Sequence, residues 1–497
     1  MLFNSLAFVL FVACFFTFWP LVKNRTAIRC CYIVAASLFC YGWWNGYYLF
    51  ILILSGVVDF AAALLIAGSR TKRQKRILLL LSMSSNLGLL GTFKYSEFIV
   101  ESINVFLRWL RYTGTDLTVS LPDFFLVLPV GISFYTFQSM SYTIDVYKGD
   151  LKPTKNILHF FAYLTLFPQL VAGPIERASN LLPQIAKTPK PLTEEERFQA
   201  LCLIVWGYFK KMVIADNLAY VVNDVFRFLN TPFRDGALYG WVTVLGFAFQ
   251  IYCDFSGYTD IARGLARWMG LHLMKNFNMP YFSTDIREFW SRWHISLSSW
   301  FRDYVYIPLG GSRNGMWRTH RNLWITLGLS GLWHGAAWTF VCWGLVHALF
   351  SSIEHCFHLC ASLKKKGFFG ITLAWFLTSV QILVAWVFFR SENVSQALDL
   401  LKTMFSCNLT GGVPFEDFFK WNFIGLTMST KRICFVLFVC GCLFLPEACY
   451  LFCRKRNINF VEKLKIPRFA QAAFLGLLLF LCAFFRGPGQ QFIYFQF

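Results

Sequence analysis

The chain has 497 residues, of which 57% are apolar, 19% aromatic and only 14% charged. Soluble globular proteins carry about 25% charged and about 45–50% apolar residues, so this composition excludes a soluble fold. It also excludes a disordered, fibrous or secreted disulfide-rich protein, and it predicts an all-α protein that crosses a membrane several times. A net charge of +20 would suggest nucleic acid as a partner of a soluble protein. Here the basic residues form short clusters between apolar runs, which is how positive loops set membrane topology, so we expect no nucleic-acid partner.

The sixteen cysteines are scattered and indicate neither a disulfide framework nor a metal site. The one dense Cys/His cluster, residues 355–360 (HCFHLC), lacks the spacing of a zinc site. No other set of His, Cys and carboxylate residues has a convincing ligand spacing. We therefore expect small, free, buried thiols and no metal.

Three apolar runs begin the chain, over 1–21, 27–44 and 48–66, and each is about long enough to span a bilayer. The first has no basic n-region, so it is not predicted to be a cleaved signal. A basic loop with Lys23, Arg25 and Arg29 follows the first run, and a second basic loop at 70–76 follows the third. Uncharged aromatic residues join the second and third runs. Both basic loops are therefore expected in the cytoplasm and the N-terminus outside.

Further apolar runs follow near 77–93, 124–140, 157–173, 199–220 and 237–253. Residues 97–121 mix charged and apolar positions and predict an interfacial segment rather than a span. In the polar loop 186–198, Thr193 followed by Glu196 predicts a capping box at the start of the next helix. Asp59, inside the third run, has no partner that the sequence identifies.

The last third of the chain carries apolar runs at 371–389, 432–452 and 470–485. One basic cluster, 364–366, precedes them, and another separates the last two runs: Arg454, Lys455, Arg456, Lys463, Lys465 and Arg468. Placing both clusters inside puts 391–430 and 487–497 outside. Because no repeat or low-complexity linker divides the chain, the sequence predicts one domain over 1–497, with ten to twelve helices.

Residues 254–321 are too polar to face lipid, since each charge at the membrane centre costs about 2.5–3.5 kcal/mol on insertion scales. This segment must line a water-filled cavity, pack inside protein or lie at the cytoplasmic interface. Asp260, Arg263 and Arg267 lie three and four residues apart, which favours a buried or interfacial ion network on a helix.

The almost uncharged stretch 322–354 has cytoplasmic charges at both ends, so the chain must enter the membrane and return. Two passes of about 16 residues are short of the roughly 20 that a span needs. A re-entrant or kinked hairpin is therefore predicted, with its turn near 333–335 and any irregular backbone shielded from lipid.

His334 is the strongest catalytic candidate, because it lies at the predicted turn within 330–338 (SGLWHGAAW), among small residues. A neutral imidazole can accept a hydroxyl proton at physiological pH, and an ionisable residue within the membrane is a functional candidate. A structural histidine is the alternative. For His347, on an apolar helix, a hydrogen-bonded core residue is the favoured interpretation. The other histidines lie in loop-like or basic sequence or in no motif, except His294.

Several strings in order carry a resemblance to a known family: 128–137 (LPVGISFYTF), 142–145 (YTID), 167–175 (FPQLVAGPI), 255–258 (FSGY), 288–290 (EFW), 292–298 (RWHISLS), 300–304 (WFRDY), 306–311 (YIPLGG), 330–338 and the terminal 492–497 (FIYFQF). By these strings the chain resembles the membrane-bound O-acyltransferase (MBOAT) family, in particular the bacterial branch of alginate O-acetyltransferase membrane subunits. The D-alanyl transfer protein of teichoic acid modification is a more distant relative. The sequence departs from the family pattern at Cys253, Ser291 and Ser312, which could adjust the substrate.

The resemblance implies an MBOAT-like helical bundle with re-entrant or interfacial segments around a central funnel, with its motif-dense core at about 128–358. His334 matches the family's essential histidine, and His294 matches a second motif-bound one. His294 could orient the donor or stabilise developing charge, unless it is a structural histidine. The family transfers an acyl group from a thioester to a hydroxyl, so His334 would be the general base. On the predicted cytoplasmic side the phosphates of coenzyme A would meet Arg287, Arg292, Arg302 and Arg313. The positive charge of cytoplasmic loops in general is the alternative explanation of these arginines. The candidate substrate-binding residues are Trp293, Trp333, Arg287, Arg292, Arg302, Asp303 and Ser330.

We therefore expect a multi-pass O-acyltransferase of the bacterial inner membrane, with both termini extracytoplasmic. No tightly bound cofactor is expected, and acetyl-CoA or another acyl thioester or acyl carrier would be the donor. A cell-surface polysaccharide such as alginate would be the acceptor, reached directly or through a separate periplasmic or anchored esterase-like partner. A transporter for a surface polymer is the alternative, although no matched halves with broken helices are visible. A scaffold that has lost catalysis is a third possibility.

Overall fold

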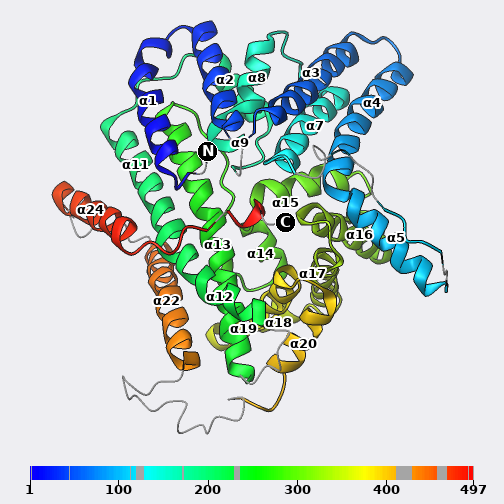
Figure 1. The fold of residues 1–497 in the computed structure, drawn as a ribbon, viewed down its shortest axis with the longest axis vertical. Helices are drawn as coiled ribbons and strands as arrows, with labels where there is room; N and C mark the ends of the chain where they lie inside the picture. The colour runs from blue at the N-terminus through cyan, green and yellow to red at the C-terminus, as the bar shows by residue number, and fades with distance from the viewer. Residues whose placement is uncertain are drawn as a thin grey trace. The chain divides into compact units, whose positions relative to one another are not determined.

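The computed structural model describes residues 1, 3–43, 45–111, 114–118, 122, 128–170, 173–228, 236–409, 428–455, 467–490 and 492–495. All regular structure within these ranges is helical (Figure 1), as the composition predicts. The chain groups into two compact units, one of 1–204 with 261–275 and the other of 205–260 with 276–497. The single domain over 1–497 and the boundaries of its core stay predictions.

Six helical stretches within the described residues are long and apolar enough to cross a membrane: Tyr47–Gly68, Lys72–Trp109, Glu194–Asn223, Trp338–Phe357, Gly367–Arg390 and Cys434–Cys453. Three shorter apolar helices add to them, Leu6–Val22, Thr26–Gly42 and Arg468–Phe484. The protein is therefore a multi-pass membrane protein, whereas its orientation and its membrane stay predictions. Several of the sequence-based assignments lie outside the described residues: Trp44, the part of the fifth run at 124–127, the part of the segment 391–430 at 410–427, and Arg456, Lys463 and Lys465.

The first unit is built from helices whose bounds are α1 (Leu6–Val22), α2 (Thr26–Gly42), α3 (Tyr47–Gly68), α4 (Lys72–Leu90), η1 (Gly91–Tyr95), α5 (Ser96–Trp109), α7 (Ile132–Lys148), α8 (Ile157–Thr165), α9 (Phe167–Leu170), α10 (Ala178–Ala186) and the start of α11 (Glu194–Tyr208). Helices α3, α4 and α7 run side by side (Figure 1). The π-helix η1 carries α4 directly into α5, so Lys72–Trp109 is one continuous helical stretch. The interfacial location of 97–121 stays a prediction.

The predicted capping box is confirmed. The Thr193 hydroxyl accepts a hydrogen bond from the backbone N–H of Glu196 at 3.2 Å. The Glu196 carboxylate accepts one in return from the backbone N–H of Thr193 at 2.9 Å. This reciprocal pair satisfies two amides that the first turn of α11 leaves without a helical acceptor.

Arg29 is a correction to the predicted basic loop, because it lies within α2 and is only 1% exposed. Its guanidinium donates to the carbonyl of Lys23 at 2.6 Å and to those of Ile185 and Lys187 at 2.8 and 3.0 Å. The last two carbonyls lie at the C-terminal end of α10, where the helix dipole favours a cation. Arg29 therefore joins α2 to α10.

Asp59 also has partners that the sequence does not reveal. Its carboxylate accepts hydrogen bonds from the Ser82 hydroxyl at 2.5 Å and from the Asn86 amide at 2.9 Å to each oxygen. Ser55 donates to the Asn86 carbonyl oxygen at 2.7 Å, which completes a buried polar link between α3 and α4. A buried carboxylate is tolerated in an apolar bundle when its lone pairs are filled in this way.

The second unit contains η2 (Phe209–Ala215), α12 (Asp216–Phe228), α13 (Ala237–Trp268, through Asp260), η3 (Pro280–Phe282), α14 (Ile286–Arg292), α15 (Ile295–Phe301), η4 (Arg302–Tyr306), α16 (Met316–His334), α17 (Trp338–Phe357), α18 (Leu359–Lys364), α19 (Gly367–Arg390), α20 (Val394–Met404), α22 (Met428–Lys455), α24 (Arg468–Phe484) and η5 (Ile493–Phe495). Part of the polar stretch 254–321 forms the short helices α14, α15 and η4, whereas its two ends belong to the long helices α13 and α16.

The hairpin predicted over 322–354 is the pair α16 and α17, which pack against each other (Figure 1). The turn is confirmed, since α16 ends at His334 and α17 begins at Trp338. The predicted arm length of about 16 residues is wrong, because polar residues extend the two helices to 19 and 20 residues. Helix α17 is long enough to span, and the re-entrant path stays a prediction.

Candidate active site

His334 is the last residue of α16, and its side chain is only 3% exposed. Aromatic rings surround its imidazole, with ring centroids 4.9 Å away at Trp343 on α17, 5.0 Å at Trp333 and 5.4 Å at Phe389 on α19. The helix ends at His334 because the next residue, Gly335, is extended, so the side chain lies where the hairpin turns. The structure therefore holds this imidazole in a dry, aromatic environment.

His294 lies at the junction between α14 and α15, and it is fully buried. Its backbone is left-handed, with φ 41° and ψ 53°, a conformation that a residue with a side chain adopts only at a cost and that is frequent at functional sites. Asn276 secures the junction, because its backbone carbonyl accepts from the Ile295 N–H at 2.9 Å and its side chain accepts from the Ser296 hydroxyl at 2.6 Å. The sequence analysis missed Asn276, which lies in no quoted string.

The two histidines come together, although 40 positions separate them in the sequence. Their ring centroids are 6.3 Å apart, and the Trp333 ring is 6.0 Å from His294 as well as beside His334. Burial lowers the pKa of His294 to about 3, since a charged imidazole loses hydration there. His294 is therefore neutral at physiological pH.

The ring of Tyr494 also lies beside the two histidines, and Tyr494 was not among the predicted site residues. Its ring centroid is 5.6 Å from that of His334, 6.4 Å from His294 and 4.7 Å from Phe255. The terminal string 492–497 was the available signal, because it forms part of the family resemblance. Burial raises the pKa of the Tyr494 phenol well above its ordinary value, so it stays protonated.

The other predicted apolar and hydroxyl residues divide into two groups. Trp333 contacts both histidines, and Ser330 is buried one helical turn before His334. Trp293 is fully buried, but its ring packs at 5.0 Å on Phe277 and 4.9 Å on Trp386. Trp293 thus belongs to the wall behind His294, and its substrate-binding role stays a prediction.

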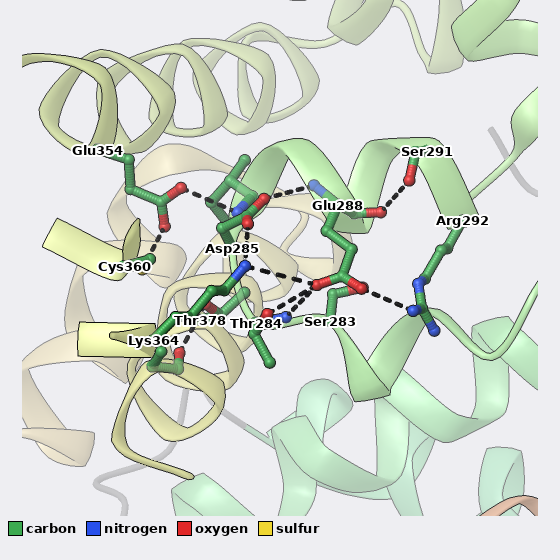
Figure 2. A network of polar contacts seen from close by, with 12 residues as sticks. Ser283, Thr284, Asp285, Glu288, Ser291, Arg292, Glu354, Cys360, Lys364 and Thr378 are labelled. Atoms are coloured by element: carbon green, nitrogen blue, oxygen red, sulfur yellow. Dashed lines mark hydrogen bonds and ion pairs between the residues drawn. The ribbon is translucent and has the colours of Figure 1, made fainter. Parts of the chain in front are cut away.

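Three of the four predicted charged residues, Arg292, Arg302 and Asp303, form ion pairs. Figure 2 shows Arg292 directed at Glu288, with their charged atoms 2.6 Å apart, and Lys364 placed between Asp285 and Glu288, at 2.5 Å from the Asp285 carboxylate. Arg302 pairs with its neighbour Asp303 at 2.7 Å, and Arg287 is exposed. Contact of these residues with coenzyme A phosphates stays a prediction.

The same network holds α14 in place. The Asp285 carboxylate caps this helix by accepting from the Glu288 N–H at 2.6 Å, and the Glu354 carboxylate of α17 accepts from the Ile286 N–H at 3.0 Å. Cys360 donates to Glu354 at 3.3 Å, and burial beside this carboxylate raises the pKa of the Cys360 thiol to about 12. Because α14 ends at Arg292, two residues before His294, the network fixes the helix that precedes this histidine.

The hydrogen-bonded interpretation of His347 is wrong. Within the described residues neither ring nitrogen has a hydrogen-bond partner, and the side chain is fully buried. Its ring packs 5.0 Å from both Trp290 and Trp343 and lies parallel to Phe289. His347 therefore supports the aromatic wall behind His334. Among the described residues no three His, Cys, Asp or Glu side chains group as metal ligands.

Comparison of the sequence with known proteins agrees with the geometry of the site. The profile of the membrane-bound O-acyltransferase family matches residues 148–391, which include both histidines. The probable alginate O-acetylase AlgI of Pseudomonas aeruginosa is 37% identical over 442 residues, which cover 88% of this chain and 80% of that protein. The chain belongs to the membrane-bound O-acyltransferase family.

Two further relatives of this MBOAT protein extend the comparison to other polymers. The peptidoglycan O-acetyltransferase of Helicobacter pylori is 36% identical over 405 residues, covering 76% of this chain and 74% of that protein. The teichoic acid D-alanyltransferase of Bacillus subtilis is 29% identical over 258 residues, covering 49% and 62%. The protein is thus a membrane O-acyltransferase, and the transporter and scaffold alternatives are set aside. The family profile ends before Tyr494, which lies outside the matched stretch.

Proposed function

We propose that this O-acyltransferase moves an acetyl group from acetyl-CoA, arriving from the cytoplasm, towards a hydroxyl group of an extracytoplasmic polysaccharide. The observation that carries the proposal is the convergence of His334 and His294, 6.3 Å apart between ring centroids, among buried aromatic rings. The relatives named for alginate and peptidoglycan O-acetylation support a glycan acceptor. The tight aromatic surroundings of His334 favour a short acyl group.

The two histidines take different roles in this proposal. His334 acts as general base and takes the proton of the attacking hydroxyl as its oxygen bonds to the thioester carbonyl carbon. The tetrahedral intermediate then collapses, the carbon–sulfur bond breaks, and the coenzyme A sulfur leaves and receives that proton. His294, with its pKa lowered to about 3, is too weak a base for the first step. A neutral imidazole can instead donate an N–H hydrogen bond to the developing oxyanion.

The route to the polysaccharide includes a second protein in our proposal. An esterase-like protein, periplasmic or anchored, accepts the acetyl group on its own hydroxyl and passes it to the polymer. The membrane protein then has N- and C-termini on the outer side of the bacterial inner membrane, and its acceptor side faces that partner. In this arrangement the acceptor hydroxyl at His334 belongs to the partner or to the glycan, and the same chemistry serves both.

The test measures thiol release from acetyl-CoA by purified protein in detergent, with and without an alginate oligosaccharide. His334→Ala is expected to lower the rate by about 10²–10⁴-fold, the usual contribution of a general base. His320→Ala is the matched control, because His320 lies on the same helix but hydrogen-bonds Ser352 at 3.1 Å, away from the site. Equal rates in His334→Ala and wild type would remove His334 from the mechanism. Release by neither protein would show that acetyl-CoA and the alginate oligosaccharide alone are not sufficient for turnover.

A further inference from the structure

A buried ion cluster in the second unit lies outside the machinery described so far. The Lys211 ammonium group on η2 is 2.8 Å from the Asp216 carboxylate and 2.7 Å from the Asp254 carboxylate on α13. The three side chains are at most 4% exposed. One lysine between two aspartates leaves a net negative charge in an apolar setting, so further hydrogen-bond donors are needed to satisfy the carboxylates.

One such donor comes from a segment far along the chain, whose described residues are 485–490 and 492–495 and which is called the segment 485–495 below. The second oxygen of the Asp254 carboxylate accepts from the backbone N–H of Ile493 at 2.7 Å. Lys211 in turn donates to the backbone carbonyl of Gln490 at 3.2 Å. The backbone N–H of Gly487 donates to the carbonyl of Met212 at 2.9 Å. The segment therefore supplies hydrogen-bond partners to the buried charges, and the buried charges in turn hold the segment in place.

Gly487 marks the closest approach of the segment to η2 and α12. A Cβ atom at this position would lie 2.4 Å from the carbonyl carbon of Asp216 and 2.5 Å from the backbone nitrogen of Asn217. Real Cβ atoms essentially never come under 3.0 Å of another heavy atom. By contrast, a Cβ atom at Gly489 would meet nothing within 4 Å. Glycine is therefore required at 487 by packing and not at 489.

One turn of α13 links the ion cluster to the two histidines. Asp254 holds residue 493, while the adjacent Phe255 and the following Tyr258 pack on Phe492, with ring centroids 5.7 and 4.5 Å apart. The Phe255 ring also contacts both Tyr494 and His294, at 4.7 Å each. Figure 1 shows the segment in red beside α13. The ion cluster thus determines where the Tyr494 ring stands relative to His334.

We propose that Lys211 and Asp254 are positioning residues for acyl transfer, which hold the segment 485–495 so that Tyr494 completes the histidine site. This inference rests on the proposed function, since it assigns these residues to the same reaction. They act through the segment and touch neither histidine themselves. A polar, paired attachment in place of an apolar one specifies a single register for the segment, because each buried charge must meet its own partner.

Lys210 provides a matched control for Lys211. It is the preceding residue on η2 and is also buried, and its ammonium group pairs with Asp260 on α13 at 2.6 Å and with Ser256 at 2.9 Å. Lys210→Met and Lys211→Met therefore each remove one buried ammonium group from an ion pair with α13, but only the second releases the segment. Gly487→Ala and Gly489→Ala form a second pair, and neither alters a charge. Gly487→Ala should displace the segment, whereas Gly489→Ala should leave it in place.

The experiment compares these four full-length variants with wild type by two measurements. Acetyl-CoA thiol release gives kcat and KM, and hydrogen exchange with mass spectrometry reports the protection of 485–495. For Lys211→Met and Gly487→Ala we expect faster exchange in this segment and a fall in kcat of about 10²-fold, which a displacement near 1 Å causes. We expect the donor KM to change less than about twofold, because the loss is one of transition-state positioning rather than of donor affinity. Lys210→Met and Gly489→Ala should keep kcat within about threefold of wild type.

A double variant separates positioning from general destabilisation. If Lys211 acts through Tyr494, adding Lys211→Met to Tyr494→Leu lowers kcat no further than Tyr494→Leu alone. Full additivity, unchanged exchange in Lys211→Met, or an equal kcat loss in Lys210→Met would each overturn the proposal. The hydrogen-exchange comparison needs no donor. If wild type releases no thiol, that result counts against the proposed function alone. Hydrogen exchange then still shows whether Lys211 holds the segment in place.

Discussion

The crossing of α16 and α17 offers a sharp test of how the backbone positions His334. A Cβ atom at Gly331 would lie 2.2 Å from the carbonyl oxygen of Phe340, and one at Gly344 would lie 2.2 Å from that of Leu327. The two glycines therefore let the helices touch backbone to backbone, as small residues do between membrane helices. His334 follows Gly331 by one turn and packs against Trp343, the neighbour of Gly344.

Gly331→Ala must push the helices apart by at least about 0.8 Å to bring that contact above the 3.0 Å limit. Such overpacking costs about 1–3 kcal/mol of stability. The displacement falls between His334 and Trp343, and a shift near 1 Å at a catalytic group lowers the rate by about 10²-fold. Thiol release from acetyl-CoA measures the rate, and thermal unfolding in detergent measures stability.

Gly328→Ala is the control, one turn earlier on the same helix. Its Cβ atom would meet only a Leu345 methyl group at 3.6 Å, an ordinary contact. Replacing glycine within a helix then stabilises by up to about 1 kcal/mol. We expect Gly328→Ala to keep full activity. Wild-type activity in Gly331→Ala, or an equal loss in Gly328→Ala, would refute the idea that this crossing sets the position of His334.

Three further predictions concern charged and titratable groups. His294 stays neutral when buried, with its pKa near 3, but protonates near 6.5 when unfolded, so stability should fall by up to about 1.4 kcal/mol per pH unit as pH drops from 6.5 towards 3. Unfolding scans at pH 5 and 7 should show a shallower fall for His294→Gln, and equal slopes would contradict the burial argument. Asp59→Ala leaves the buried donors of Ser82 and Asn86 without their acceptor and should cost about 1–3 kcal/mol for each group, measured by thermal unfolding; an unchanged unfolding temperature would show that the link is not needed. Arg292→Met should raise the KM for acetyl-CoA at constant kcat if this arginine meets the donor phosphates, whereas an unchanged KM would restrict it to its ion pair with Glu288.

Local signals in this sequence predicted local structure correctly. The capping box of Thr193 and Glu196 spans four positions, and its hydrogen bonds form as the spacing indicates. The turn after His334 lies where small residues interrupt an apolar stretch. Composition was sufficient for the class of protein, because only a membrane provides surroundings for so many apolar side chains. The strings of the family pattern were sufficient to identify His294 and His334 as the candidate histidines.

Contacts between distant positions were decided by the tertiary structure alone. Arg29 was assigned to a basic loop because other basic residues lie close to it in the sequence. Its hydrogen-bond acceptors include the carbonyls of Ile185 and Lys187, more than 150 positions away. For the buried His347, nothing in the sequence distinguishes a hydrogen-bonded ring from one that only packs against other rings.

The composition, the helical periods and the family strings of this chain by themselves determined a helical membrane acyltransferase with two candidate histidines. Only the tertiary structure decided what surrounds those histidines, and Tyr494 is the clearest case. Asp254 holds the segment before it through a hydrogen bond between residues 239 positions apart. The physical reason is that helices and caps arise from neighbours along the chain, whereas a buried carboxylate takes whichever donor the packed helices bring to it.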